Sequence, residues 1–282
     1  NFMEGAGLYQ AVTYSLTSDE LAQKFALKAE ETTRLLMPMS EERATLRQSL
    51  IPHLVEAASY NVARSTELVS LYEIGSVFLG QTAEELPYEE EHLAFVVTGK
   101  WVDNSWQGEK LNADFFVAKG IVEGLFEKLG LTDRVSYKKA SVDGLHPGQT
   151  AAILLDGEKV GLIGGLHPIE RKKYDLKETF VAELNLKAII ETVTEELVYS
   201  AVPRFPAVTR DIALELDRNK PAGEIEKVIR DAGTKLLKDV KVFDVYEGDK
   251  MEAGKKSVAF SLTYFDPEGT LTDDEVVNAH NK

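Results

Sequence analysis

The stretch "FDVYEGDKMEAGKKSVAFSLTYF" (residues 243–265) predicts two β-strands joined by a polar connection. Side chains alternate between the two faces of a strand. In strand 257–265 the apolar positions therefore face a core: Val258, Phe260, Leu262 and Tyr264. Small residues face away from it: Ser257, Ala259, Ser261 and Thr263. Strand 240–246 is expected to bury Phe243 and Val245 and to turn Asp244 and Tyr246 outward. The outer face of the sheet is therefore expected to carry small side chains and one aromatic ring, that of Tyr246.

The neighbouring segments complete a compact βαββα pattern. "DIALEL" (211–216) predicts a strand that adds Ala213 to the outer face, and "PAGEIEKVIRDAGTKLL" (221–237) predicts an amphipathic helix. Thr272 and Glu275 form a capping-box pattern that starts a second helix. This order is that of a ferredoxin-like fold without its last strand. With a first residue that is Asn1 and not Met, we interpret the chain as a fragment cut at both ends.

The residues before 200 mix strands and helices without a regular βαβ alternation. Helical spacing runs through 43–64, with a kink or a helix start near Pro52, and 114–130 predicts a second helix. Asp156-Gly157 predicts a hairpin turn within 150–166. Further strands are expected at 67–79, 91–99 and 179–186, and the acidic run 83–92 reads as a solvated loop. This pattern predicts an α+β fold with an antiparallel sheet, and prolines near 203 set a boundary between domains 1–199 and 200–282.

Composition narrows the classes of function. The 282 residues include no cysteine, which excludes disulfides and thiolate metal sites, and no apolar run approaches the roughly 20 residues of a membrane helix. The net charge of −15 argues against a polyanionic partner in general and against DNA. The charge is unevenly spread, however. Residues 200–282 hold 13 Lys+Arg against 16 Asp+Glu, and the earlier residues hold 19 against 31, so the second part can carry a basic face.

The outer sheet face suits a flat ligand. Tyr246 offers a ring for stacking, Asp244 can accept hydrogen bonds from a base, and Ser257 can donate or accept. Single-stranded RNA is commonly bound in this way, with Arg204, Lys255 and Lys256 as possible phosphate contacts. Ordinary solvated sheet faces are also built from small and polar residues, so the pattern alone leaves both interpretations open.

Other chemistry is weakly represented. The histidines show no HxxxH or HxH spacing, and we expect no metal site. The sequence contains no P-loop, GxGxxG motif or nucleophile elbow. The stretch "GLIGGLHPIER" (161–171) has only a faint likeness to an ATP-binding signature, and the hairpin explains its strand fully. We therefore expect no catalytic residue in this chain.

Several motifs together resemble the beta subunit of bacterial phenylalanyl-tRNA synthetase. "RFPAVTRDIALEL", "FDVYEG" and "KKSVAFSLTYFDPEGTLTDDEV" are similar to its C-terminal anticodon-binding domain. "LYQAVTYSLTS", "LRQSLIPHLVEA", "LYEIGSVF", "SWQGEK", "FFVAKGIVEGLF" and "LHPGQTAAILLDGEKVGLIGGLHP" resemble the preceding domain, in the same order. The resemblance covers nearly the whole chain.

The resemblance implies a class II synthetase-like domain without catalytic competence, followed by a truncated anticodon-binding domain. Its implied partners are a catalytic alpha chain, in a heterotetramer of two alpha and two beta chains, and tRNA(Phe), in the cytoplasm. By the motif match, Asp244, Tyr246 and Ser257 fall where the family contacts the anticodon. ATP and magnesium serve the whole enzyme, and no cofactor is expected in this chain.

Two other functions stay open. Ferredoxin-like domains also serve as amino-acid-sensing regulatory modules, although these usually have a glycine-rich loop where this chain has "DRNKPAG" (217–223). A freestanding ligase, active without a partner chain, is the second alternative.

Overall fold

The computed structural model describes residues 2–80, 86–104, 106–193, 204–248 and 251–281. The chain divides into two compact units, Asn1–Glu195 (unit 1) and Glu196–Lys282 (unit 2). The expected boundary between residues 199 and 200 lies outside the described residues. Within the described ranges, no helix is both long and apolar enough to cross a membrane.

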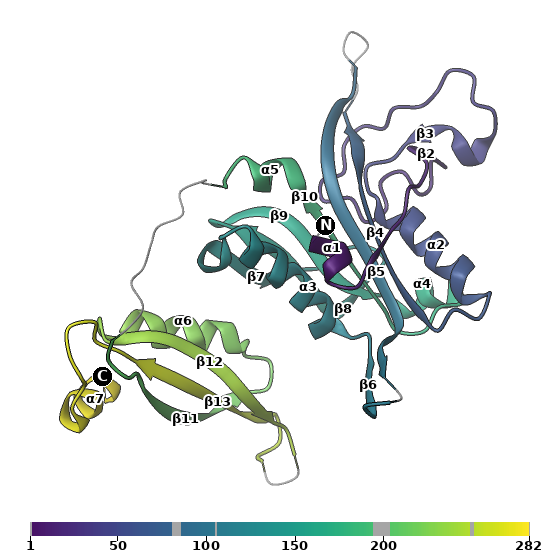
Figure 1. Cartoon of the computed structure of the whole chain (residues 1–282). Coiled ribbons are helices and arrows are strands. Elements are labelled where there is room, and N and C mark those ends of the chain that lie inside the picture. Colours follow the sequence, from purple (N-terminus) through teal and green to yellow (C-terminus); the bar gives the residue numbers. More distant parts are fainter. Residues whose placement is uncertain (1, 81–85, 105, 194–203, 249–250, 282) are drawn as a thin grey trace. The chain divides into compact units, whose positions relative to one another are not determined.

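Unit 1 is built on a large sheet that is antiparallel except for one short parallel pair, β1 with β4 (Figure 1). Its strand order is β1-β4-β5-β10-β9-β8-β7, with β6 paired to β5. The bounds are β1 Tyr9–Gln10, β4 Leu68–Leu79, β5 Tyr88–Asn104, β6 Glu109–Asn112, β7 Val135–Lys139, β8 Leu145–Leu155, β9 Glu158–Leu166 and β10 Thr179–Asn185. A separate small sheet pairs β2 Leu16–Thr17 with β3 Thr45–Leu46.

Helices cover both faces of the large sheet. On β5, Leu93, Phe95 and Val97 pack in a core with α3, whereas Ala94 and Val96 pack in a second core with α2. Strand alternation therefore places α2 and α3 on opposite faces, as Figure 1 shows. The helices of this unit are α1 Phe2–Gly5, α2 Ile51–Val62, α3 Phe115–Lys128, α4 Pro168–Lys173 and α5 Leu186–Ile190, with 3-10 turns η1 Glu41–Arg43 and η2 Thr132–Arg134.

Most local signals in unit 1 behave as predicted, but the helical pattern of 43–64 forms a helix only from Ile51, whereas Thr45 and Leu46 form strand β3. Helix α2 begins next to Pro52, and Asp114 caps α3 by accepting a hydrogen bond from the backbone of Val117. Asp156 and Gly157 both have positive φ, 52° and 88°, the geometry of a tight hairpin turn between β8 and β9. The α+β fold class expected from the sequence is confirmed.

The acidic run is not a loop along its whole length. Residues 88–92 belong to β5, where they pair with β4 residues 75–79, and His92 is buried. Residues 83–85 of the same run lie outside the described part of the chain. The prediction of a solvated loop is therefore wrong for the strand residues.

Unit 2 has the predicted βαββα order. The elements are β11 Val208–Asp217, α6 Ala222–Ala232, β12 Leu237–Tyr246, β13 Lys255–Tyr264 and α7 Asp273–His280. The three strands form an antiparallel sheet in the order β11-β13-β12, and Thr272 and Glu275 form the expected capping box. Within this sheet β11 is an edge strand. Both helices pack in a single core with one face of the sheet (Figure 1).

Candidate nucleic-acid interface

The central strand β13 fixes the two faces of the unit 2 sheet. Its apolar residues are buried against the helices, as predicted: Val258, Phe260, Leu262 and Tyr264. Ile212, Leu214 and Leu216 of β11 pair with inward positions and join the same core. The opposite face consists of Ser257, Ala259, Ser261 and Thr263, flanked by Thr209, Asp211, Ala213 and Glu215 of β11. Among the described residues of unit 2, no helix packs on this outer face.

Strand β12 carries an irregularity that the sequence reading missed. Val242 pairs with Phe260, and the next registered pair is Asp244 with Ala259, so Phe243 is an extra residue in a β-bulge. Val240 and Val242 therefore lie on the core side, while Asp244 and Tyr246 lie on the outer side, opposite Ala259 and Ser257. The predicted outward placement of Asp244 and Tyr246 agrees with this register.

The predicted burial of Phe243 and Val245 is wrong. The side chain of Phe243 is 55% exposed and that of Val245 is 50% exposed, and neither belongs to the core cluster. The bulge reverses the alternation in mid-strand, so the core receives Val240 and Val242 instead. Val245 keeps an inward register opposite Val258 but is only half covered.

The Tyr246 ring lies close to the backbone of Gly248. A Cβ atom at residue 248 would lie 2.4 Å from the Tyr246 hydroxyl and 2.6 Å from its Cζ atom. Real side chains do not tolerate such distances, so glycine is what lets the ring lie against the chain. The ring is 44% exposed and remains open to a ligand.

Three outer-face rows form the candidate site. Ala213, Ala259 and Asp244 lie side by side across the three strands, and Glu215, Ser257 and Tyr246 form the next row. Further along, Asp211 and Lys241 flank Ser261. The two alanines make a floor without bulk, bordered by a ring, a carboxylate and a hydroxyl.

The charge of this face is negative. Among the carboxylates with outward register, Asp217 pairs with Lys255 and Asp239 pairs with Arg230. The carboxylates of Asp211, Glu215 and Asp244 remain, against the ammonium group of Lys241. A phosphate group is repelled from such a floor, whereas the N–H groups of a base are attracted to it. The face suits base edges better than an RNA backbone.

Of the three predicted phosphate contacts, Lys255 has outward register, at the first residue of β13. Lys255 pairs with Asp217 at 2.8 Å; the hydrogen bond and the charge of this pair raise the pKa of Lys255 and lower the pKa of Asp217. Lys256 has the register of Leu216 and leaves the sheet on the core side. Arg204 is exposed, ahead of β11. The contacts of these three residues with phosphate stay predictions.

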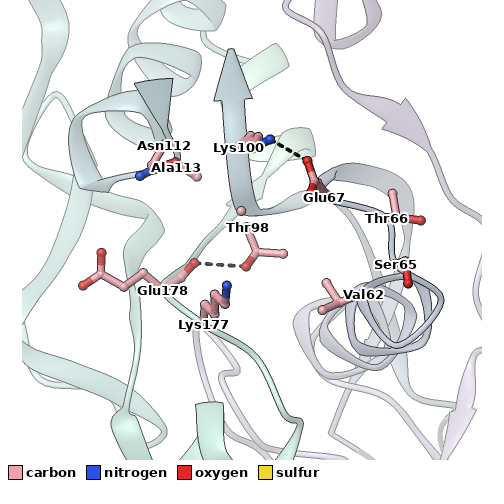
Figure 2. A pocket seen from close by; sticks show the side chains of 11 residues that line it. Val62, Ser65, Thr66, Glu67, Thr98, Lys100, Asn112, Ala113, Lys177 and Glu178 are labelled. Atoms are coloured by element: carbon pink, nitrogen blue, oxygen red, sulfur yellow. Dashed lines mark hydrogen bonds and ion pairs between the residues drawn. The ribbon is translucent and has the colours of Figure 1, made fainter. Parts of the chain in front are cut away.

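Unit 1 has a hollow at one end of β5 (Figure 2). Its volume of about 480 Å³ is that of a small-ligand pocket. The Lys100 ammonium group, however, already pairs with the carboxylates of Glu67 and Asp103, and the Thr98 hydroxyl donates to the Glu178 carbonyl oxygen at 3.0 Å. Its lining offers no set of converging groups that would hold nucleotide phosphates.

A buried polar cluster ties β10 to the start of α2. The Glu183 carboxylate is fully buried and accepts hydrogen bonds from the Ser49 hydroxyl at 2.5 Å and from the Leu50 backbone N–H at 3.2 Å. His92 Nδ1 lies 2.7 Å from the same carboxylate, and Nε2 lies 3.2 Å from Glu90. Burial disfavours the charged imidazole, but the hydrogen bonds and charges of the two glutamates outweigh it and raise the pKa of His92. Each polar group has a structural partner.

The glycines of "GLIGGLHPIER" serve close packing. A Cβ atom at Gly161 would lie 2.7 Å from the backbone oxygen of Glu183, and one at Gly164 would lie 2.7 Å from the Thr150 hydroxyl. Glu170 pairs with Lys24 at 2.6 Å. Among the residues that the structure describes, no group of three or more His, Cys, Asp and Glu side chains is placed to hold a metal ion.

Comparison with known proteins links both units to one enzyme. Residues 1–186 match the family model of the phenylalanyl tRNA synthetase beta chain CLM domain, and residues 203–282 match that of the ferredoxin-fold anticodon binding domain. The whole chain is 56% identical to the phenylalanine–tRNA ligase beta subunit of Bacillus thuringiensis subsp. konkukian and 54% identical, over 281 residues, to that of Bacillus subtilis. The Geobacillus kaustophilus subunit is 56% identical over 281 residues.

The chain spans 35% of the length of these relatives. The two family models match its two compact units in order, and together they cover most of its residues. The chain therefore belongs to the phenylalanyl-tRNA synthetase beta chain family.

Proposed function

We propose that the outer face of unit 2 binds unpaired bases of the tRNA(Phe) anticodon. Tyr246 stacks on one base, Asp244 accepts hydrogen bonds from base N–H groups, and Ser257 donates or accepts beside them. The observation that carries the proposal is the outward register of Asp244 and Tyr246 next to the Ala213–Ala259 floor. The match to an anticodon binding domain family supports it.

The charge distribution supports recognition of bases more than of backbone. The carboxylates of the floor keep phosphates away from its centre, so the RNA backbone runs along the rim. Lys255 contacts a phosphate when its ion pair with Asp217 is replaced by one with the RNA backbone. Arg204 and Lys256 contact phosphates at the edge of the face. With few phosphate contacts, the affinity of this site depends only weakly on salt.

Unit 1 acts as a non-catalytic support for the alpha chain. Its buried Glu183 carboxylate is held by Ser49 and His92, and its Lys100 is held by two carboxylates. Activation of phenylalanine with ATP and magnesium then belongs to the alpha chain, in a cytoplasmic heterotetramer of two alpha and two beta chains. Pyrophosphate exchange by the isolated 282-residue chain tests this assignment. We expect none, and measurable exchange would contradict it.

The RNA proposal is tested by tRNA affinity in the assembled alpha–beta enzyme. Because base–aromatic stacking contributes about 1–3 kcal/mol, Tyr246→Ala should weaken binding by roughly 5- to 150-fold. Tyr246→Phe keeps the ring and serves as the matched control, with affinity close to that of the parent enzyme. Unchanged affinity of the alanine variant, with the domain folded, would rule out this face.

A further inference from the structure

The β-bulge in β12 places a second aromatic residue, Phe243, directly before the outward-facing Asp244. Between Val242, opposite Phe260, and Asp244, opposite Ala259, the extra residue is Phe243. Val242 points to the core, and the strand then presents Phe243 and Asp244 in succession beside Ala259. The Phe243 ring is 55% exposed and takes no part in the core cluster.

The bulge allows Val240 and Val242 to face the core while Asp244 and Tyr246, later in the same strand, face outward. Without it, the outward register of Asp244 and Tyr246 would turn Val240 and Val242 outward as well, and both belong to the core cluster or pack against it. The bulge requires an extra residue in the strand but does not require that residue to be apolar, so a polar side chain would be compatible with this exposed position. A phenylalanine there leaves a large apolar ring uncovered, next to the alanine floor.

We infer that Phe243 is a second stacking residue, which binds an RNA base different from the one that Tyr246 binds. This inference rests on the proposed function. Phe243 lies in the Ala259 row and Tyr246 in the Ser257 row, two residues along β13, which corresponds to about 6.7 Å. The Tyr246 ring lies against Gly248, on the side away from Phe243 in the chain. The two rings therefore open onto neighbouring positions of the face and do not enclose one base.

The class of ligand follows from the groups between the rings. Asp244 is flanked by both aromatic residues and offers only acceptor oxygens when ionised. The ligand is a segment of single-stranded RNA with two adjacent splayed bases, of which one presents N–H donors to the carboxylate.

The first test is tRNA affinity of the assembled enzyme with substitutions at residue 243. Phe243→Ala and Phe243→Leu should each weaken binding by about 5-fold or more, because neither side chain offers a ring, whereas Phe243→Tyr should retain binding. Val245→Ala, next along the strand and half exposed, is the matched control and should bind normally. Circular dichroism and alpha-chain co-purification verify that each variant folds and assembles.

The second test uses tRNA with an abasic site at each anticodon position in turn. The effect of Phe243→Ala should vanish at one position and that of Tyr246→Ala at the adjacent one. If both effects vanish at the same position, the two-base inference is wrong. If only Tyr246→Ala weakens binding, Phe243 has no RNA contact and the proposed function stands. If neither variant weakens binding, the proposed function fails too. Weaker alpha-chain co-purification with Phe243→Ala, with unchanged tRNA affinity of the enzyme that does assemble, would assign the ring to a protein contact and overturn the inference.

Discussion

The two sheets of this chain differ in what covers them. The unit 1 sheet is packed on both faces, with α2 on one side and α3 on the other, and it buries even charged groups such as Glu183. Within the described residues, the unit 2 sheet packs helices on one face and leaves on the other a floor of small residues beside the exposed ring of Tyr246. A sheet buried on both sides supports a structure, whereas a sheet bare on one side can hold a flat ligand.

The difference extends to the polar groups. In unit 1 the carboxylate of Glu183 has three protein partners and is fully buried, so a ligand does not reach it. In unit 2, Asp244 is exposed on the outer face. Substitutions should therefore change stability in unit 1 and RNA binding in unit 2.

The largest expected effect is on the stability of unit 1. Glu183→Gln removes the charge that holds His92 and Ser49, and breaking a buried ion pair typically costs about 3–5 kcal/mol. Both tryptophans, Trp101 and Trp106, lie in unit 1, so urea unfolding followed by tryptophan fluorescence reports this unit. Glu158→Gln, on an exposed strand end, is the control. A loss below about 1 kcal/mol for Glu183→Gln would mean that the cluster does not hold the sheet to α2.

The next effect is the pH dependence of the same unit. Burial, together with the charges of Arg43 and Arg47, lowers the pKa of His53 from 6.5 to about 4. Between about pH 6.5 and about pH 4, His53 is protonated in the unfolded chain but neutral in the folded chain. The free energy of unfolding therefore decreases as the pH falls through this range, by up to about 3 kcal/mol. Urea unfolding at several pH values, compared with His53→Gln, measures the contribution. An identical slope for parent and variant in this window would refute it.

A smaller effect separates tightly packed glycines from open ones. At Gly161 a Cβ atom would meet Leu184 at 2.5 Å and the Glu183 backbone oxygen at 2.7 Å, so Gly161→Ala should destabilise unit 1 by about 1–3 kcal/mol. At Gly120, within α3, nothing lies within 4 Å, and Gly120→Ala should stabilise the helix by about 0.5–1 kcal/mol. The same fluorescence assay compares them. Equal effects would show that β9 and β10 are not closely packed at this point.

The smallest effect concerns the contact between the Tyr246 ring and the backbone of Gly248. A methyl group at residue 248 displaces the ring from the backbone, so Gly248→Ala should weaken tRNA binding severalfold in the assembled enzyme without lowering the thermal stability of unit 2. Gly269→Ala, at an open position of the same unit, is the matched control and should leave affinity unchanged. Normal affinity of Gly248→Ala would indicate that ring placement is not important for binding.

Much of the fold could be predicted from local sequence signals. The Asp156-Gly157 turn and the Thr272 capping box depend on neighbours in sequence, and the structure confirms them. The apolar stripes of the helices are confirmed in part, because Phe116 and Val228 are exposed. The outward register of Asp244 and Tyr246 followed from simple alternation. The roles of these residues, of Ser257 and of the basic rim stay predictions.

The bulge was missed because strand 240–246 has no consistent alternation. Val240 and Val242 are apolar at even positions, and Phe243 and Val245 at odd ones. This change of the apolar residues from even to odd positions was the signal in the sequence, and a β-bulge accommodates such a change because it inserts one extra residue into the strand. The buried cluster of unit 1 was missed for a different reason. His92 was assigned to the acidic run, although Glu183, in the apolar stretch "TFVAELNL", indicated a buried charge that needs a partner.

Photocrosslinking of tRNA to the assembled enzyme tests the central claim most directly. A photoreactive residue at position 241, on the outer face, should crosslink to the anticodon loop, whereas one at position 227, exposed on α6, should not. Crosslinks from position 227 and none from position 241 would contradict the assignment of the RNA site to the bare face of the sheet.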